Sequence, residues 1–184
     1  MKTNILLILS IIAIGISFNS YADIPIPKIK PNYHYLTSEQ QKEVDCLAGT
    51  IYFEARGESE SGQIAVGLAT INRTYSSHFP DSVCRVIKER KNGICQYNWY
   101  CNHKQKKIFY AMNHENDNTA YNDTLKLATY IYINRQYIND LTKNAVFFHR
   151  TSVNPRWKNV IRTTTIGKHV FYASRIPEIN SKNI

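Results

Sequence analysis

The sequence has few acidic residues. It also lacks the motifs that would indicate a zinc site or a nucleic-acid-binding protein. It holds 14 Asp and Glu against 23 Lys and Arg, a formal net charge of +9. Its four cysteines include no Cys-x-x-Cys pair, which makes a zinc site a weak interpretation. No internal repeat, low-complexity tract or known nucleic-acid-binding motif follows the N-terminal segment, so nucleic acid is not the expected partner of this basic chain.

The one long apolar run lies at the N-terminus. Lys2 precedes an apolar stretch from Ile5 to Phe18, and Ser20-Tyr21-Ala22 supplies the small residues of a cleavage site, so residues 1–22 are expected to be a signal peptide. The run is near the short end for a membrane span, and an uncleaved anchor is the alternative. The residue directly after Ala22 is Asp23 and not a cysteine, which argues against a lipoprotein. We expect an exported protein, periplasmic or secreted, without stable membrane insertion after cleavage.

The remaining chain has room for one domain. Residues 23–36 contain Pro25, Pro27 and Pro31 and are expected to form an extended linker. A catalytic domain at 37–176 and a tail at 177–184 complete the expected organisation, and we expect a monomer. Loss of the signal removes only Lys2, so the mature charge is about +8, which suits an anionic partner such as the bacterial wall.

A helix is expected to carry the central acidic residue, Glu54. Thr37 or Ser38 can cap its start, with Gln40 or Gln41 completing a capping box. The apolar residues that follow recur at helical spacing and place Glu54 at the margin of the buried stripe. Gly57 is expected to end the helix in a left-handed conformation.

That position should raise the pKa of Glu54. Partial desolvation and the negative end of the helix dipole both disfavour its charged form, which suits a proton donor near neutral pH. The alternative is a solvated glutamate paired with Arg56, Lys42 or Lys143.

Further elements follow from periodicity. We expect a buried second helix from Ile64 to Tyr75, in which Gly67 permits a close crossing, and a short helix opened by Pro80. Cys95 to Cys101 alternates as a strand does. The remaining expected elements are a loop at 113–122, a helix at 121–137, and strands at 145–149 and 163–174 with a turn at Gly167-Lys168.

Five blocks in order resemble the SleB-type cell-wall hydrolases, the spore cortex-lytic enzyme family. They are Tyr-Phe-Glu-Ala-Arg-Gly-Glu-Ser from position 52, Gly-Gln-Ile-Ala-Val-Gly from 62, Ile-Asn-Arg from 71, Cys-Gln-Tyr-Asn-Trp from 95 and Ile-Gly-Lys-His-Val-Phe-Tyr from 166. The resemblance implies a lysozyme-like α+β fold, mainly helical with a small antiparallel β-sheet or hairpin. It also implies cleavage of peptidoglycan with Glu54 as the catalytic acid and no cofactor.

The expected reaction breaks the bond between N-acetylmuramic acid and N-acetylglucosamine. A lytic transglycosylase giving 1,6-anhydro products is favoured, because the chain has no securely placed second carboxylate. The alternatives are a hydrolytic muramidase or glucosaminidase that uses water, a non-catalytic wall-binding protein, and a zinc amidase. Glu58 is a possible second acid, or it favours the start of the next helix, and Arg56 is a possible support for the loop between them.

Substrate-binding candidates come from the aromatic and amide-rich stretch and from one histidine. Gln96, Tyr97 and Trp99 could line a glycan cleft, with core packing as the alternative for the two rings. His149, and less so His169, could contact substrate, relay protons or bind metal, although a structural histidine is commoner and no metal site is expected.

The four cysteines should form disulfides in an exported protein. Four cysteines allow three connectivities, and we favour Cys46 with Cys84 and Cys95 with Cys101. Free thiols and a zinc site are the alternatives for the second pair.

Overall fold

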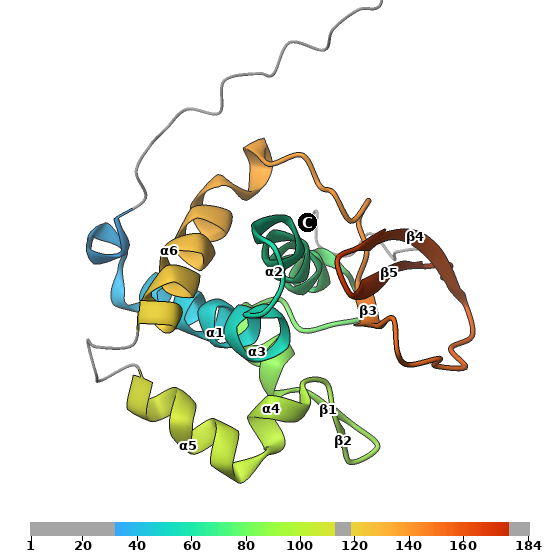
Figure 1. Ribbon diagram of the computed structural model, residues 1–184, viewed down its shortest axis with the longest axis horizontal. Coiled ribbons are helices and arrows are strands. Elements are labelled where there is room, and N and C mark those ends of the chain that lie inside the picture. Colours follow the sequence, from blue (N-terminus) through green and yellow to red (C-terminus); the bar gives the residue numbers. More distant parts are fainter. Residues whose placement is uncertain (1–31, 113–118, 177–184) are drawn as a thin grey trace, which may run out of the picture.

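The computed structural model describes residues 32–112 and 119–176, which form a helical body with a small sheet at one side (Figure 1). The helices are η1 Tyr33–Tyr35, α1 Ser38–Ala55, α2 Glu60–Tyr75, α3 Val83–Lys88, α4 Asn98–Cys101, α5 His103–Met112, α6 Thr119–Asn134 and η2 Arg135–Tyr137. The strands are β1 Arg90–Lys91, β2 Ile94–Cys95, β3 Phe147–Arg150, β4 Val160–Ile166 and β5 His169–Ser174. The expected signal peptide, most of the linker and the tail lie outside the described residues.

Helix α1 begins as expected, but its end differs from the expectation. Thr37 and Gln40 form a capping box in which each side chain accepts a hydrogen bond from the other's backbone N–H. The helix stops at Ala55, and Arg56 follows with ordinary helical angles. Gly57 is not among the glycines with positive φ, so the expected left-handed stop is wrong.

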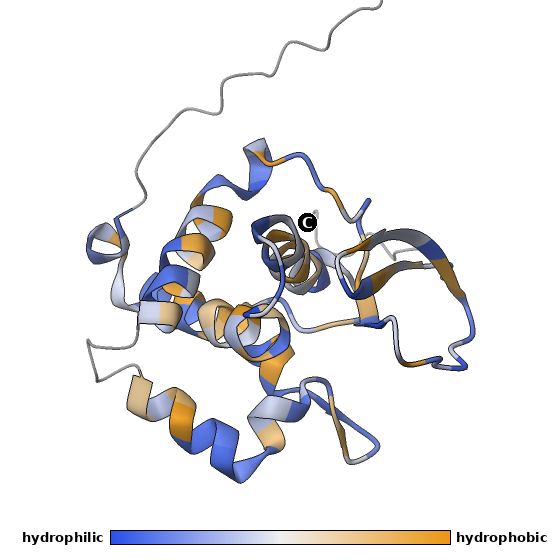
Figure 2. Ribbon diagram, in the orientation of Figure 1, coloured by the Kyte–Doolittle hydropathy of each residue, from blue (hydrophilic) through white to orange (hydrophobic). Residues whose placement is uncertain are grey.

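The core forms where α1, α2 and α6 meet. Leu47 and Ile51 of α1 and Leu68 of α2 are fully buried (Figure 2 shows these helices coloured by hydropathy). A Cβ at Gly67 would lie 2.8 Å from Ile131 Cδ1 and 3.2 Å from Ile51 Cδ1, so any larger residue would force these side chains to shift. The predicted close crossing is therefore present, and it fixes α1 in the centre of the body.

The C-terminal strands form an antiparallel sheet in the order β3-β5-β4. Strands β4 and β5 are joined by the turn at Gly167, whose φ is +56°. Helix α2 contacts both β3 and β4, so the sheet packs beside the helix that follows the Glu54 loop. The predicted strands and turn are confirmed in this region.

The strand expected at residues 95–101 is wrong. Only Ile94–Cys95 is extended, and Asn98–Cys101 is the helix α4. Cys95 and Cys101 are bonded with their Cα atoms 6.4 Å apart. Six residues of strand would span about 20 Å, so the disulfide and the strand could not coexist.

Other differences from expectation are present. The short helix expected to open at Pro80 begins at Val83, with Ser82 as its N-cap. The loop expected at 113–122 gives way to α6 from Thr119, and the intervening residues 113–118 are outside the described part. Helix α5 had not been predicted at all. At the end of the expected linker, Tyr33–Tyr35 form a 3-10 turn, from which the Tyr33 hydroxyl donates to Asp45 at 2.8 Å.

Both predicted disulfides are present. Cys46 of α1 is bonded to Cys84 of α3, and Cys95 to Cys101. The first joins two helices of the body, and the second closes the short turn that carries Gln96 and Tyr97. Of the helices in the described part, none is both long and apolar enough to cross a membrane.

Candidate active site

Glu54 lies in the last turn of α1 and is half-buried. Burial raises the pKa of its carboxyl group, while the positive charges of Arg73 and Arg150 oppose part of that rise. The pairings proposed as alternatives are not formed: Lys42 pairs with Glu39, and within the described residues no cation lies within ion-pair distance of Glu54. The carboxyl group is therefore shielded but keeps no fixed counter-ion.

Arg73 is a buried cation near this acid, and sequence reasoning gave it no role. It is 3% exposed, and its Nε–H donates to the Val146 carbonyl at 2.6 Å. Its guanidinium carbon lies 4.9 Å from the centre of the Tyr97 ring and 5.6 Å from that of Phe148. The available signal was its place in the Ile-Asn-Arg block, the third of the five blocks in chain order.

Gln96 is held against Arg73. With the amide oriented so that both partners are satisfied, Gln96 Oε1 accepts from Nη1 and Nη2 of Arg73 at 3.2 Å each. The side chain is half-buried. The substrate-binding prediction for Gln96 stays a prediction, and the structure adds that its oxygen is already occupied.

Tyr97 and Trp99 are core residues, each 2% exposed. The Tyr97 hydroxyl is 2.9 Å from Thr70 Oγ1, and the Trp99 ring stacks on Phe53 with centroids 5.0 Å apart. Rings buried in this way have almost no free face for a sugar. The interpretation of these two residues as a glycan-stacking face is therefore wrong, and the core alternative holds.

Glu58 is hydrogen-bonded to the β4–β5 turn of the sheet. Its Oε2 accepts from the Lys168 backbone N–H at 2.9 Å, across 110 residues of sequence. A Cβ added at Gly167 would collide with the same oxygen, so the carboxylate fills the space that glycine leaves. This contact fixes the β4–β5 turn to the loop after α1 and disagrees with a role as a second acid beside Glu54.

Arg56 is exposed and lies over the Tyr52 ring, 4.7 Å from its centre. The described contacts include no hydrogen bond or ion pair from its side chain to Glu58 or to a loop carbonyl, so the proposed loop support is not present among them.

The two histidines differ. His149 Nδ1 lies 2.8 Å from the Arg150 carbonyl, which can only accept, so this nitrogen carries the proton. Its Nε2 is 3.1 Å from the Tyr172 hydroxyl. His169 is 1% exposed, and burial lowers the pKa of its imidazole. His169 is thus a buried residue whose neutral form is favoured, whereas His149 belongs to a partly exposed aromatic cluster.

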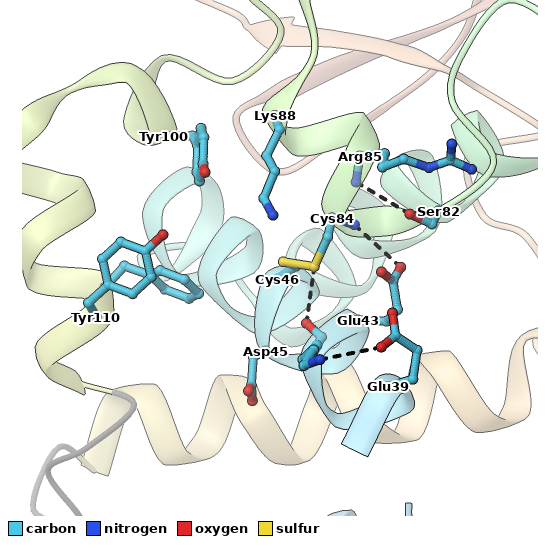
Figure 3. Close-up of a pocket in the computed structure, with 12 residues that line it drawn as sticks. Glu39, Glu43, Asp45, Cys46, Ser82, Cys84, Arg85, Lys88, Tyr100 and Tyr110 are labelled. Atoms are coloured by element: carbon cyan, nitrogen blue, oxygen red, sulfur yellow. Dashed lines mark hydrogen bonds and ion pairs between the residues drawn. A yellow bond between two sulfur atoms is a disulfide. The ribbon is translucent and has the colours of Figure 1, made fainter. Parts of the chain in front are cut away.

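Two pockets lie away from Glu54. One of about 400 Å³ lies beside the Cys46–Cys84 disulfide, with Tyr100 and Tyr110 on one side and Ser82 and Arg85 on the other (Figure 3). The other, of about 460 Å³, lies between α1, α2 and α6. Glu54 lines neither pocket. In the described ranges, no group of three or more His, Cys, Asp or Glu is placed to hold a metal ion.

The chain belongs to the cell wall hydrolase family, whose model matches residues 57–172. The match begins at Gly57, three residues after Glu54. The predicted SleB-type resemblance is confirmed at the level of the family.

Named relatives agree with this assignment. A spore cortex-lytic enzyme of Bacillus cereus is 29% identical over 71% of this chain and 44% of its own length. One from Oceanobacillus iheyensis is 39% identical over 32% of this chain and 21% of its own length. The chain thus spans less than half the length of these curated relatives.

The solved catalytic domain of the Bacillus cereus SleB protein is similar in structure. It is 27% identical, with a TM-score of 0.50 over 71% of this chain and 89% of that domain. The predicted α+β, lysozyme-like fold, mainly helical with a small antiparallel sheet, is confirmed.

Proposed function

We propose that this chain cleaves the glycan strand of peptidoglycan between N-acetylmuramic acid and N-acetylglucosamine, with Glu54 as general acid and base. The observation that carries the proposal is the half-buried Glu54 carboxyl group, whose pKa is raised by burial and partly restrained by two arginines. Membership of the cell wall hydrolase family supplies the substrate class.

The environment of Glu54 suits both halves of such a reaction. Burial favours the protonated form, which donates its proton to the glycosidic oxygen as an oxocarbenium-like state develops. Arg73 and Arg150 favour the ionised form that this donation leaves behind. A group that must be protonated first and ionised next requires this balance, because either influence alone would hold one form.

A single acid favours the transglycosylase outcome. Ordinary glycosidases place a second carboxylate about 5–9.5 Å from the acid, and a charge that close would raise the pKa of Glu54 further. The charges that most affect the pKa of Glu54 are those of two arginines, and Glu58 is bound to the β4–β5 turn. Ionised Glu54 would instead take the proton of the muramic acid C6 hydroxyl, whose oxygen then attacks C1 and gives a 1,6-anhydro sugar.

Product mass tests this proposal. Purified sacculi digested by the protein should release muropeptides that lack one water relative to hydrolysis products. Products with an ordinary reducing end would favour the hydrolytic alternative. Intact glycan with released stem peptides, lost with a chelator and restored by zinc, would instead identify the amidase alternative.

The remaining expectations on organisation and location form part of the proposal. A signal peptide at 1–22 would deliver a catalytic domain at 37–176 to the periplasm or the outside of the cell, where peptidoglycan lies. N-terminal sequencing of the exported protein should read from Asp23, and any other start would contradict the proposed cleavage site.

A further inference from the structure

The C-terminal part of the described chain is uniformly basic. Residues 141–176 contain seven Lys and Arg and no Asp or Glu. They include the whole three-stranded sheet, which lies at one side of the molecule (Figure 1). Glu58 reaches the sheet only at its β4–β5 turn. The sheet therefore presents positive charge that its own sequence does not neutralise.

An exposed tryptophan is fixed on this basic surface. Trp157 is 42% exposed, and it lies in the segment between β3 and β4. Its ring centroid lies 5.5 Å from that of His149 and 5.7 Å from those of Phe147 and Tyr172. Trp157 does not belong to either buried core cluster. An indole that is held by three rings yet open to solvent is suited to stacking on a ligand.

The supporting rings are themselves held in place. His149 stacks on Tyr172 with centroids 5.4 Å apart and planes inclined by 26°. The two ring nitrogens of His149 are taken by the Arg150 carbonyl and the Tyr172 hydroxyl. The cluster of Trp157, His149 and Tyr172, hereafter the aromatic platform, therefore loses little freedom when a ligand binds.

Arg150 adjoins the aromatic platform in β3 and is one of the two cations that lower the pKa of Glu54. Arg150 follows His149 at the end of β3, and its charge acts on the Glu54 carboxyl group. The loop beyond it is pinned, because Thr151 N–H donates to the Lys168 carbonyl at 2.8 Å and Val153 N–H to the Arg150 carbonyl at 2.9 Å. The end of β3 therefore carries both His149 of the platform and a positive charge that acts on Glu54.

We propose that the aromatic platform is a binding site for the peptidoglycan glycan strand beyond the cleaved bond. The apolar face of a pyranose ring would stack on Trp157. The exposed side chains of Arg156 and Lys158, on either side of Trp157, would meet the carboxylates of muramic acid or its stem peptide. The identity of this ligand depends on the proposed function, whereas the existence of the site is inferred from the contacts observed on the sheet.

Binding without turnover provides the test. The Glu54→Gln chain is incubated with purified sacculi, and its affinity is compared with that of the same chain carrying Trp157→Ala or Trp157→Phe. We expect Trp157→Ala to weaken binding about tenfold and Trp157→Phe to weaken it less. Tyr137→Ala, which removes a 60% exposed ring from η2, is the matched control and should leave affinity unchanged.

A second readout guards against misfolding of the variants. The chain has two tryptophans, and Trp99 is buried, so Trp157 should account for most quenching by acrylamide. Soluble glycan strands should protect this fluorescence in the Glu54→Gln chain and not in its Trp157→Phe form. Equal affinity of all variants, or no protection of Trp157, would overturn the platform while leaving the proposed reaction intact. Failure of the Glu54→Gln chain to bind sacculi at all would overturn both.

Discussion

The helical body and the three-stranded sheet divide the work of this molecule. The body is closely packed, with Leu47, Ile51 and Leu68 fully buried, and it holds Glu54 at the end of its central helix. The sheet is half-exposed, and the stretch that contains it lacks acidic residues. The difference indicates that the shielded body raises the pKa of Glu54. The sheet and its loops supply the positive charge and the aromatic surface proposed to bind a ligand.

Truncation of one aliphatic side chain in each region gives the largest contrast in stability. Leu47→Ala removes a fully buried side chain from α1 and should cost about 2–5 kcal/mol of unfolding free energy. Ile161→Ala removes one that is 48% exposed on β4 and should change it by no more than about 0.5 kcal/mol. Denaturant titrations of both variants measure this, and equal losses would contradict the contrast.

The disulfide within the helical body should contribute more stability than the disulfide that closes the short loop. Cys46–Cys84 closes a loop of 38 residues and joins two helices of the body, so replacing both cysteines by serine should cost up to about 4 kcal/mol. Cys95–Cys101 spans 6 residues and should contribute about 2 kcal/mol. Thermal melts of the two double variants compare the losses of stability. A larger loss for the Cys95–Cys101 variant would contradict this prediction.

The contact between the regions can be broken at Gly167. An alanine there combines a φ of +56° with a Cβ placed against Glu58 Oε2, and should cost about 1–3 kcal/mol. Gly93→Ala is the matched control: its φ is +78° but its Cβ would meet nothing within 4 Å, so only about 1 kcal/mol of strain is expected. Hydrogen exchange of the Lys168 amide should rise in Gly167→Ala only. An unchanged rate there would argue against the Glu58 contact.

The smallest expected effect is the change in stability with pH, and the prediction is the direction of that change. Burial raises the pKa of Glu54, so the folded state binds more protons than the unfolded state between the ordinary and the raised pKa. The free energy of unfolding contributed by Glu54 therefore falls as pH rises through that window. Glu54→Gln does not titrate at this position, so the wild type should lose stability relative to it as the pH rises above about 4, the ordinary pKa of a glutamate. Melting temperatures that diverge the other way would contradict the buried position of Glu54.

Periodicity and local signals predicted much of the helical body. The capping box at Thr37, the close crossing at Gly67 and helices α1, α2 and α6 follow from rules that act over a few residues. Helix α5 was missed because it is largely polar, with only Phe109 and Met112 buried. The strand expected at 95–101 conflicted with the disulfide expected for the same residues, and the conflict was visible in the sequence.

The site was less accessible to sequence reasoning. Glu54 was singled out as the proposed acid through its motif, but the proposed parts of Arg73 and of the aromatic platform depend on contacts between segments far apart in the chain. Trp99 and Tyr97 looked like binding residues because aromatic rings serve both cores and ligands. The acid-free stretch at 141–176 needed only a count of charges along the chain and could have been recognised.

The rate at which purified sacculi dissolve with Glu54→Gln and with Glu58→Gln tests the central claim most directly. Glutamine at position 54 keeps the size of the side chain but cannot supply the proton, so activity should fall about 10²–10⁴-fold in a folded protein. Glutamine at position 58 can still accept from the Lys168 amide, and activity should fall less than about tenfold. Lytic activity that survives Glu54→Gln but is abolished by Glu58→Gln would contradict the account.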